Sequence, residues 1–243
     1  MNKNVLITGA SRGIGLDAAK VFAEHGCNLA LCCHNSIDEL KLLCAKLSNQ
    51  YNISASAFCA DVSDSKQSLQ LIDNATRALG SIDILINNAG ISIVGLICDL
   101  SDEDWMKIVN TNLSSVFYCS RSVLPQMIRR KSGKIINVSS VFGIYGASCE
   151  AAYSATKGGV NALTRSMAKE LAISNIQVNA AAFGAIDTSM NDNLSDEEKK
   201  SLSAEIPADR FATSMEAGEF LYHIASSPSY MNGQIIQFDG GWI

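Results

Sequence analysis

Short runs of apolar residues alternate along this chain with longer segments in which apolar residues recur every three or four positions. Runs of the first kind are typical of buried strands, and segments of the second kind of helices with one buried face. We expect strands at residues 5–7, 28–33, 53–59, 82–86, 134–138, 176–180 and 234–238. We expect helices from the glycine-rich turn to residue 25, and at 37–47, 65–79, 102–130, 151–173, 195–206 and 215–225. The segment 102–130 is expected to be one long helix or a broken pair of helices, with Pro125 distorting its C-terminal part.

Strands that alternate with helices predict a parallel sheet, in which ligands bind beyond the carboxyl ends of the strands. The 243 residues contain no linker, repeat or low-complexity segment. We therefore expect one domain over residues 1–243. Its fold should be α/β and Rossmann-type, a doubly wound parallel sheet of about seven strands with helices on both faces. The charged helix at 195–206 is expected to be a mobile flap.

The first strand runs into a glycine-rich turn, Thr8-Gly-Ala-Ser-Arg-Gly-Ile-Gly15, and a helix follows. Glycines let the backbone approach a phosphate closely, and a helix N-terminus attracts anions. The spacing of Gly9, Gly13 and Gly15 differs from the common Gly-x-Gly-x-x-Gly pattern. A tight structural turn is the alternative to a nucleotide site, and the strand–turn–helix setting favours the nucleotide site.

Tyr153 and Lys157 are four residues apart in the helical segment 151–173, so one helix face carries both. A free tyrosine has a pKa of about 10, and a lysine held beside it favours the phenolate and lowers that pKa. Because proton transfer is efficient when the pKa lies near the working pH, the pair has the ingredients of an acid–base catalyst. The alternative is one core contact beside one solvated cation.

The composition narrows the classes of function. A net charge of −5 argues against general binding to nucleic acid or anionic membranes, and no apolar run is long enough to span a bilayer. The eight cysteines form no Cys-x-x-Cys motif, so we expect buried, reduced thiols, no metal site and a cytoplasmic protein. Residues 1–4 lead directly into a strand-like run, and we expect no signal peptide.

Taken together, these residues resemble the short-chain dehydrogenase/reductase family. The matching motifs follow the family's order over nearly the whole chain: Thr8-Gly9-x-x-x-Gly13-x-Gly15, Asp61, Asn87-Asn88-Ala89-Gly90, Asn112, Ser140 and Tyr153-x-x-x-Lys157. Each motif is modest alone, but the set is specific, and Ser140 lies thirteen residues before Tyr153 as it does in the family.

The resemblance implies a catalytic set of Asn112, Ser140, Tyr153 and Lys157. Tyr153 would exchange a proton with the substrate oxygen as hydride moves, and Ser140 would hydrogen-bond the same oxygen. Lys157 would lower the pKa of Tyr153 and hold the nicotinamide ribose, and Asn112 would hold a water that links Lys157 to solvent. Two alternatives remain. The alternative for Asn112 is an amide that caps a helix kink. The alternative for Ser140 is Ser139, although side chains at a strand end alternate in direction and Ser139 should point elsewhere.

The cofactor expected from the resemblance is NADP(H). The binding residues would be Gly9, Ser11, Arg12, Gly13, Ile14, Gly15, His34, Asn35, Asp61, Val62, Asn88, Ala89, Gly90, Tyr153, Lys157, Gly184, Ile186 and Thr188. Residues 32–36, about 20 positions after the turn, lack the carboxylate that NAD-specific Rossmann proteins place on the ribose 2′-hydroxyl. Arg12 offers a guanidinium to a 2′-phosphate, with His34 and Asn35 as further donors. An exposed turn residue is the alternative for Arg12.

Segments 194–199, 206–211 and 233–241 look like one subgroup of the family, the 3-oxoacyl-[acyl-carrier-protein] reductases. The resemblance thus implies NADPH-dependent reduction of a carbonyl in fatty-acid synthesis, on a small or carrier-bound substrate, with acyl carrier protein as a partner. It also implies a homotetramer. The alternatives are a family enzyme for a free alcohol, sugar or steroid, and a non-enzymatic dinucleotide-binding regulator.

Two features depart from the family pattern. Phe183-Gly184 stands where Pro-Gly is usual, so we expect a looser or reshaped loop and a phenyl ring that narrows the nicotinamide side of the pocket. Arg129 and Arg130 would meet an acidic carrier protein, but residues 174–175 lack the basic side chain often found nearby. A solvated helix end that complements the helix dipole is the alternative for the two arginines.

Overall fold

The structure is a computed structural model that describes residues 3–192 and 194–243. Its centre is a sheet of seven parallel strands in the order β3-β2-β1-β4-β5-β6-β9. The strands are β1 (Asn4–Thr8), β2 (Asn28–Cys33), β3 (Ala55–Cys59), β4 (Ile84–Asn87), β5 (Gly133–Ser140), β6 (Ile176–Phe183) and β9 (Ile235–Phe238). The expected lack of a signal peptide rests in part on Met1 and Asn2, which lie outside the described residues.

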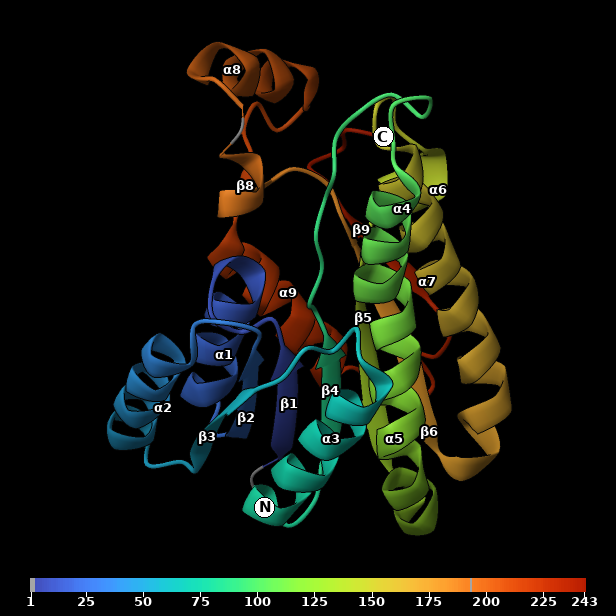
Figure 1. The fold of residues 1–243 in the computed structure, drawn as a ribbon. Coiled ribbons are helices and arrows are strands. Elements are labelled where there is room, and N and C mark those ends of the chain that lie inside the picture. Colours follow the sequence, from blue (N-terminus) through green and yellow to red (C-terminus); the bar gives the residue numbers. More distant parts are fainter. Residues whose placement is uncertain (1–2, 193) are drawn as a thin grey trace.

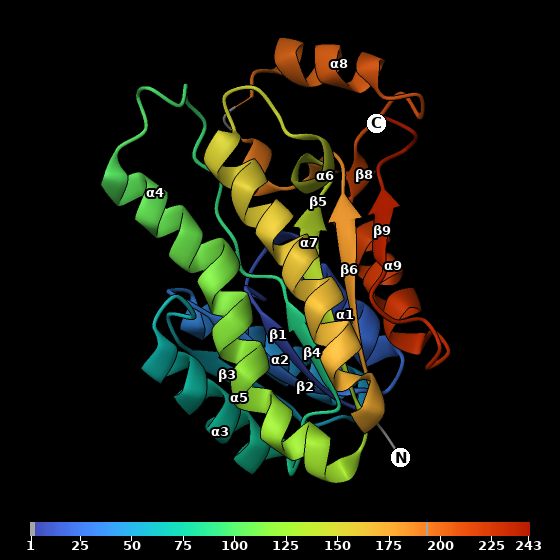
Figure 2. The ribbon, with the colours of Figure 1, turned by 90° about the vertical axis from the view of Figure 1, so that its right-hand side faces the viewer.

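Helices cover both faces of the sheet (Figure 1, Figure 2). On one face lie α1 (Gly13–Glu24), α2 (Ile37–Tyr51) and α9 (Ser214–Ser226), and on the other α3 (Ser65–Leu79), α5 (Ser115–Arg130) and α7 (Ala151–Leu171). Each face has its own apolar core because successive strand residues point to opposite sides. Leu29 and Leu31 of β2 join the first core, and Ala30 and Cys32 join the second. The predicted doubly wound sheet is confirmed.

Of the two arrangements expected over residues 102–130, one long helix or a broken pair, the structure has the broken pair. A π-helical turn, η1 (Asn110–Ser114), joins α4 (Asp102–Val109) to α5, and Pro125 lies inside α5. The other short elements are α6 (Phe142–Tyr145), η2 (Ala172–Ser174), η3 (Ser189–Asn191), α8 (Asp196–Glu205) and the two-stranded parallel sheet of β7 (Ile186–Asp187) and β8 (Ala212–Thr213). The helix expected at 195–206 is α8, and its mobility stays a prediction.

The connections leave β1 and β4 in opposite directions across the sheet, because β2 and β3 follow β1 on one side and β5 and β6 follow β4 on the other. This change of direction opens a crevice beyond the carboxyl ends of β1 and β4, where such folds bind ligands. The glycine turn after β1 and the segment 87–90 after β4 both border this crevice.

Phe183 does not narrow the pocket, so this expectation was wrong. The ring is buried and packs edge-on against Phe220 and Phe238, with centroid distances of 5.9 Å to each. The last residue of β6 therefore points into the core beneath α9, where an aromatic side chain buries apolar surface that a proline would not. The loop that follows is tied to β9, because the Gly184 amide donates to the Phe238 carbonyl at 3.0 Å.

Cysteines 27, 32, 33, 44 and 119 are buried, whereas Cys59 and Cys98 are exposed, contrary to the general expectation of burial; all eight are free thiols. Within residues 3–192 and 194–243, no helix has the length and apolar character needed to cross a membrane. Over the same ranges, no group of three or more His, Cys, Asp or Glu side chains could hold a metal ion.

Candidate active site

Tyr153 and Lys157 lie in the N-terminal half of α7, which packs against β5 and α6. Lys157 is 4% exposed, and its Nζ donates to the Val138 carbonyl of β5 at 2.8 Å. The same Nζ lies 5.5 Å from the centre of the Tyr153 ring. Helix α6 approaches so closely that a Cβ on Gly143 would lie 2.7 Å from the Cβ of Lys157. The ammonium group is therefore held under the phenol by the packing of the fold.

The two serines at the end of β5 point in different directions. Ser139 donates to Asn161 Oδ1 of α7 at 2.7 Å, in the core beneath the helix. Ser140 lies beside Tyr153, where its hydroxyl affects the pKa of the phenol, and its Oγ accepts a bond of 3.2 Å from the Phe142 amide. Strand alternation thus brings Ser140, and not Ser139, to the tyrosine.

Asn112 lies in the π-helical turn η1 and is buried. Its side chain accepts a bond from the Ile91 amide and donates one to the Ile91 carbonyl, both at 2.8 Å. A Cβ on Gly90 would lie 3.4 Å from Asn112 Oδ1 and 3.7 Å from Lys157 Nζ, so the three residues converge. The amide therefore fixes the segment after β4 next to Lys157. Single π-helical turns of this kind are frequent at functional sites.

Burial controls the protonation of this pair. It raises the pKa of Tyr153 to about 12; the charge of Glu150 adds to the rise, and a hydrogen bond with Ser140 opposes it. Burial also lowers the pKa of Lys157 to about 8. The expected lowering of the Tyr153 pKa by Lys157 is therefore not found, because loss of water disfavours the charged form of both groups. At neutral pH, Tyr153 is a phenol with a proton to donate.

The glycine turn forms a cradle against the segment after β4. Gly9 and Gly13 have φ angles of +65° and +53°, which residues with a Cβ rarely adopt. A Cβ on Gly15 would collide with the Gly9 carbonyl oxygen. Arg12, the N-cap residue of α1, makes no side-chain cap, so the first amide groups of this helix are available to an anion. The cradle fits the phosphates of a dinucleotide.

The other expected cofactor residues follow the ends of β2, β3, β4 and β6 along the same edge of the sheet. Thr188 reaches the glycine turn, since a Cβ on Gly13 would lie 3.3 Å from Thr188 Cγ2. His34 Nε2 lies 3.9 Å from Asp61 Oδ2, which links the ends of β2 and β3, and Asn35 is exposed beside them. Gly13 and Thr188, 175 positions apart in the sequence, thus border one crevice.

Three residues of this region were not among the expected site residues. The Thr8 hydroxyl accepts bonds from the amides of Asn88 and Ala89, at 3.0 and 3.1 Å, and so joins β1 to β4. Glu150 lies beside Tyr153, and Ser92 Oγ donates to its Oε2 at 3.1 Å. Glu150 stands three positions before Tyr153, a spacing that places both on one helix face, and this signal was available in the sequence.

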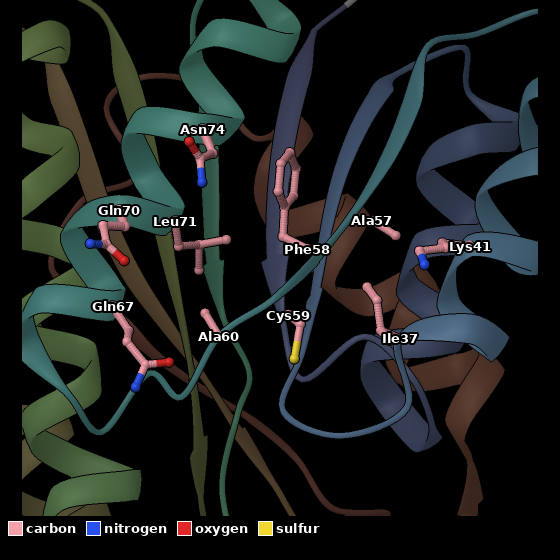
Figure 3. A pocket seen from close by; sticks show the side chains of 10 residues that line it. All are labelled: Ile37, Lys41, Ala57, Phe58, Cys59, Ala60, Gln67, Gln70, Leu71 and Asn74. Carbon is pink, nitrogen blue, oxygen red and sulfur yellow. The ribbon is translucent and has the colours of Figure 1, made fainter.

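A separate cavity of about 290 Å³ lies at the edge of the sheet between α2, β3 and α3 (Figure 3). Lys41 and Ile37 line one side, Gln67 and Asn74 the other, and Cys59 the floor. None of the expected catalytic residues lines this cavity.

The sequence profile of the family described as short chain dehydrogenase matches residues 3–199. The chain belongs to the short-chain dehydrogenase family. It is 39% identical over 242 residues to the 3-oxoacyl-[acyl-carrier-protein] reductase FabG of Staphylococcus aureus (strain Mu50), covering 99% of this chain and 98% of the relative. The uncharacterized oxidoreductase YmfI of Bacillus subtilis (strain 168) is 38% identical over 243 residues, covering 100% and 99%.

A solved structure is also similar, that of a putative short-chain alcohol dehydrogenase from Sinorhizobium meliloti 1021. Its TM-score is 0.93 at 32% identity, over 100% of this chain and 97% of the other. Membership of the short-chain dehydrogenase family makes this protein an oxidoreductase that binds a nicotinamide dinucleotide, and the cradle after β1 agrees with that.

The buried ammonium of Lys157 predicts a pH-dependent stability. Its pKa falls from 10.5 to about 8 in the folded protein, so the unfolded chain binds more protons between these values and stability rises with pH across this window. The unfolding free energy of the wild type minus that of Lys157→Met should increase by up to about 3 kcal/mol from pH 8 to pH 10.5. Both values are measured by denaturant titration without dinucleotide. Lys169→Met, an exposed lysine on the same helix, is the control. Parallel stability curves for wild type and Lys157→Met would contradict burial as the cause.

Proposed function

We propose that this protein is a single-domain, cytoplasmic, NADP(H)-dependent reductase that converts the ketone of a 3-oxoacyl thioester to a hydroxyl group in fatty-acid synthesis. The observation that carries the proposal is the meeting of Tyr153, Ser140 and Lys157 beside the glycine turn. Full-length similarity to 3-oxoacyl-[acyl-carrier-protein] reductases supports the substrate class. The free thiols agree with a reducing compartment.

In this proposal, Ser140 and Tyr153 hold the substrate oxygen between their hydroxyl groups. A reduced dinucleotide held by the glycine turn would supply the hydride that the carbonyl carbon accepts. Tyr153 donates its phenolic proton to the oxygen as negative charge develops there, and Ser140 stabilises that charge by a hydrogen bond. Because the pKa of Lys157 is lowered to about 8, this residue can exchange a proton near neutral pH and restore the phenol. Lys157 also holds the nicotinamide ribose, and Asn112 positions the water that connects Lys157 to solvent.

Apolar side chains surround the proposed mouth of the site. Exposed residues of this kind follow β4 (Val94, Leu96 and Ile97), β5 (Ile144 and Tyr145) and β7 (Met190). Exposed apolar residues that gather at one edge mark a binding surface more often than scattered ones do. They support an acyl chain as the substrate's tail.

The proposal is tested by NADPH consumption with purified protein. The substrates are 3-oxobutanoyl thioesters of acyl carrier protein and of N-acetylcysteamine, together with free ketones, sugars and steroids. Reduction of both thioesters is the expected result. Reduction of free ketones alone would favour the alternative enzyme class, and no consumption with any carbonyl would favour a dinucleotide-binding regulator.

Tyr153→Phe removes only the hydroxyl that donates the proton. We expect kcat to fall at least about a hundredfold, as is typical for loss of a general acid, while the dinucleotide Kd stays unchanged. Tyr230→Phe, which makes the same change at a fully exposed tyrosine, is the matched control. A kcat of Tyr153→Phe close to that of the wild type would show that Tyr153 is not the proton donor.

Arg12 is proposed to grip the 2′-phosphate of NADP(H). The side chain is exposed at the N-cap of α1, and no carboxylate follows β2 within residues 32–36. We expect kcat/KM to favour NADPH over NADH at least about tenfold. Arg12→Ala should abolish most of this preference and spare turnover with NADH. Arg12→Lys keeps the charge but cannot form a bidentate hydrogen-bonded contact, and it should keep part of the preference for NADPH. Equal rates of the wild type with both dinucleotides would overturn the assignment.

A homotetramer is also proposed. Trp105, Met106, Phe117 and Ile128, on the α4–α5 helix pair, each leave between 42% and 51% of their surface exposed. Apolar surface of this extent on one helix pair is typical of a contact with a second copy of the same chain.

The two arginines proposed for carrier docking differ in their surroundings. Arg130 donates to Asp83 Oδ1 at 2.8 Å and to the Ile82 carbonyl, both just before β4, at the opposite end of the strand from Gly90. Arg129 is exposed. The C-terminal end of α5 lies at the opposite end of the molecule from the N-terminal end of α7, the helix that carries Tyr153 (Figure 1). A carrier protein docked there would therefore serve the site of another subunit.

Arg129→Glu should therefore raise KM for the carrier-bound substrate several-fold, since a reversed rim charge weakens encounter with an acidic partner. KM for the N-acetylcysteamine thioester should not change. Lys200→Glu, an exposed charge reversal on α8, is the control. Equal effects of Arg129→Glu on both substrates, or none on either, would count against docking at this end.

A further inference from the structure

Three side chains form a stripe on α7 that begins with a carboxyl group. Glu150 is the N-cap residue of the helix, Tyr153 follows after three positions and Lys157 after four more. These spacings place all three on one helix face. Helix α7 begins beyond the carboxyl end of β5 (Figure 2), and Glu150, its N-cap residue, precedes Tyr153 at this end of the helix.

The position of Glu150 is fixed by contacts between two loops. Ser92, in the segment after β4, donates to Glu150 Oε2 at 3.1 Å, and the Gly95 amide of that segment donates to the Cys149 carbonyl at 2.8 Å. The bond from Ser92 stabilises the ionised carboxylate and opposes the rise of its pKa that burial causes. Glu150 is half-buried, so its charge is screened less than that of a surface residue.

No ion pair neutralises this carboxylate within residues 3–192 and 194–243; the pairs there involve Asp17, Asp38, Asp61, Asp83 and Glu216. Its field reaches the reacting centre, because the charge of Glu150 contributes to the raised pKa of Tyr153. The substrate oxygen must lie within hydrogen-bonding distance of that same hydroxyl. Substituents next to the carbonyl therefore also lie in the field of Glu150.

We propose that Glu150 determines substrate specificity by charge: its carboxylate rejects ketones that carry a negative group beside the carbonyl and favours those that carry a positive one. The inference rests on the proposed carbonyl reduction at Tyr153. A neutral 3-oxoacyl thioester is accepted, whereas the free 3-oxo acid, which is its hydrolysis product, is excluded. An unpaired charge in a pocket is a common means of discriminating against one ligand class.

A charge series on one ketone tests the proposal. Acetoacetate, its ethyl ester and its choline ester share the 3-oxobutanoyl group and differ in carrying a negative charge, none or a positive charge. In the wild type, kcat/KM should increase along this series. Glu150→Gln keeps an oxygen that can accept the Ser92 bond but removes the charge. The ratio of choline ester to free acid should fall at least about tenfold in this variant.

Glu170→Gln makes the same change at an exposed position near the far end of α7, and its ratio should equal that of the wild type. If Glu150 only supports the loops, all three substrates would lose activity equally in Glu150→Gln, and this result would overturn the inference, as would an unchanged ratio. If the wild type reduces neither these three nor the 3-oxobutanoyl thioesters, the proposed reduction itself is wrong. If it reduces the thioesters but none of the three, the proposed selection by charge is wrong. An unchanged ratio with an active enzyme refutes the role of Glu150 alone.

Discussion

The hydrogen bond from Lys157 to the Val138 carbonyl joins α7 to β5 at the centre of the site. Ser140 lies two residues further along the strand and Tyr153 one turn earlier along the helix, so this contact brings their hydroxyl groups to the same end of the sheet. It also holds an ammonium group in the interior, where its charge is costly. The geometry and the electrostatics of the site thus depend on the same packed helix.

Burial and the negative charge of Glu150 act in the same direction at Tyr153. Both raise the pKa of the phenol, and a hydrogen bond with Ser140 opposes them. A phenol is the form that the proposed reduction requires, because in that proposal the tyrosine donates a proton. A bound oxidised nicotinamide carries positive charge and would shift this balance toward the phenolate, which is the form required for the reverse reaction.

Patterns of local sequence predicted much of the fold. The bounds expected for the second strand and the third helix are those of β2 and α3, because each ends at clear polar or glycine signals. A broken pair of helices was among the expectations for residues 102–130, but the π-helical turn at Asn112 was not. The side chain in this turn makes two bonds to Ile91, 21 positions away, a contact that local sequence patterns do not contain. The orientation of Phe183 depends on Phe220 and Phe238 in the same way.

The site residues followed from motifs, but their protonation did not. Spacing alone put Lys157 beside Tyr153 and predicted a lowered pKa for the phenol. The opposite direction comes from burial by β5 and α6, a tertiary effect that the spacing does not contain. Glu150 was within reach of the same spacing argument, but its importance emerged only with its position beside Tyr153 and its bond to Ser92.

Isotope transfer tests the central claim most directly. The wild-type protein is incubated with NADPH that carries deuterium at both C4 positions and with the N-acetylcysteamine thioester of 3-oxobutanoate, in ordinary water. Our account predicts one deuterium on the carbinol carbon of the hydroxyacyl product and a hydroxyl proton from solvent, with one dinucleotide oxidised for each product formed. Product without deuterium at that carbon, or dinucleotide oxidised without product, would contradict hydride transfer to a carbonyl held by Tyr153.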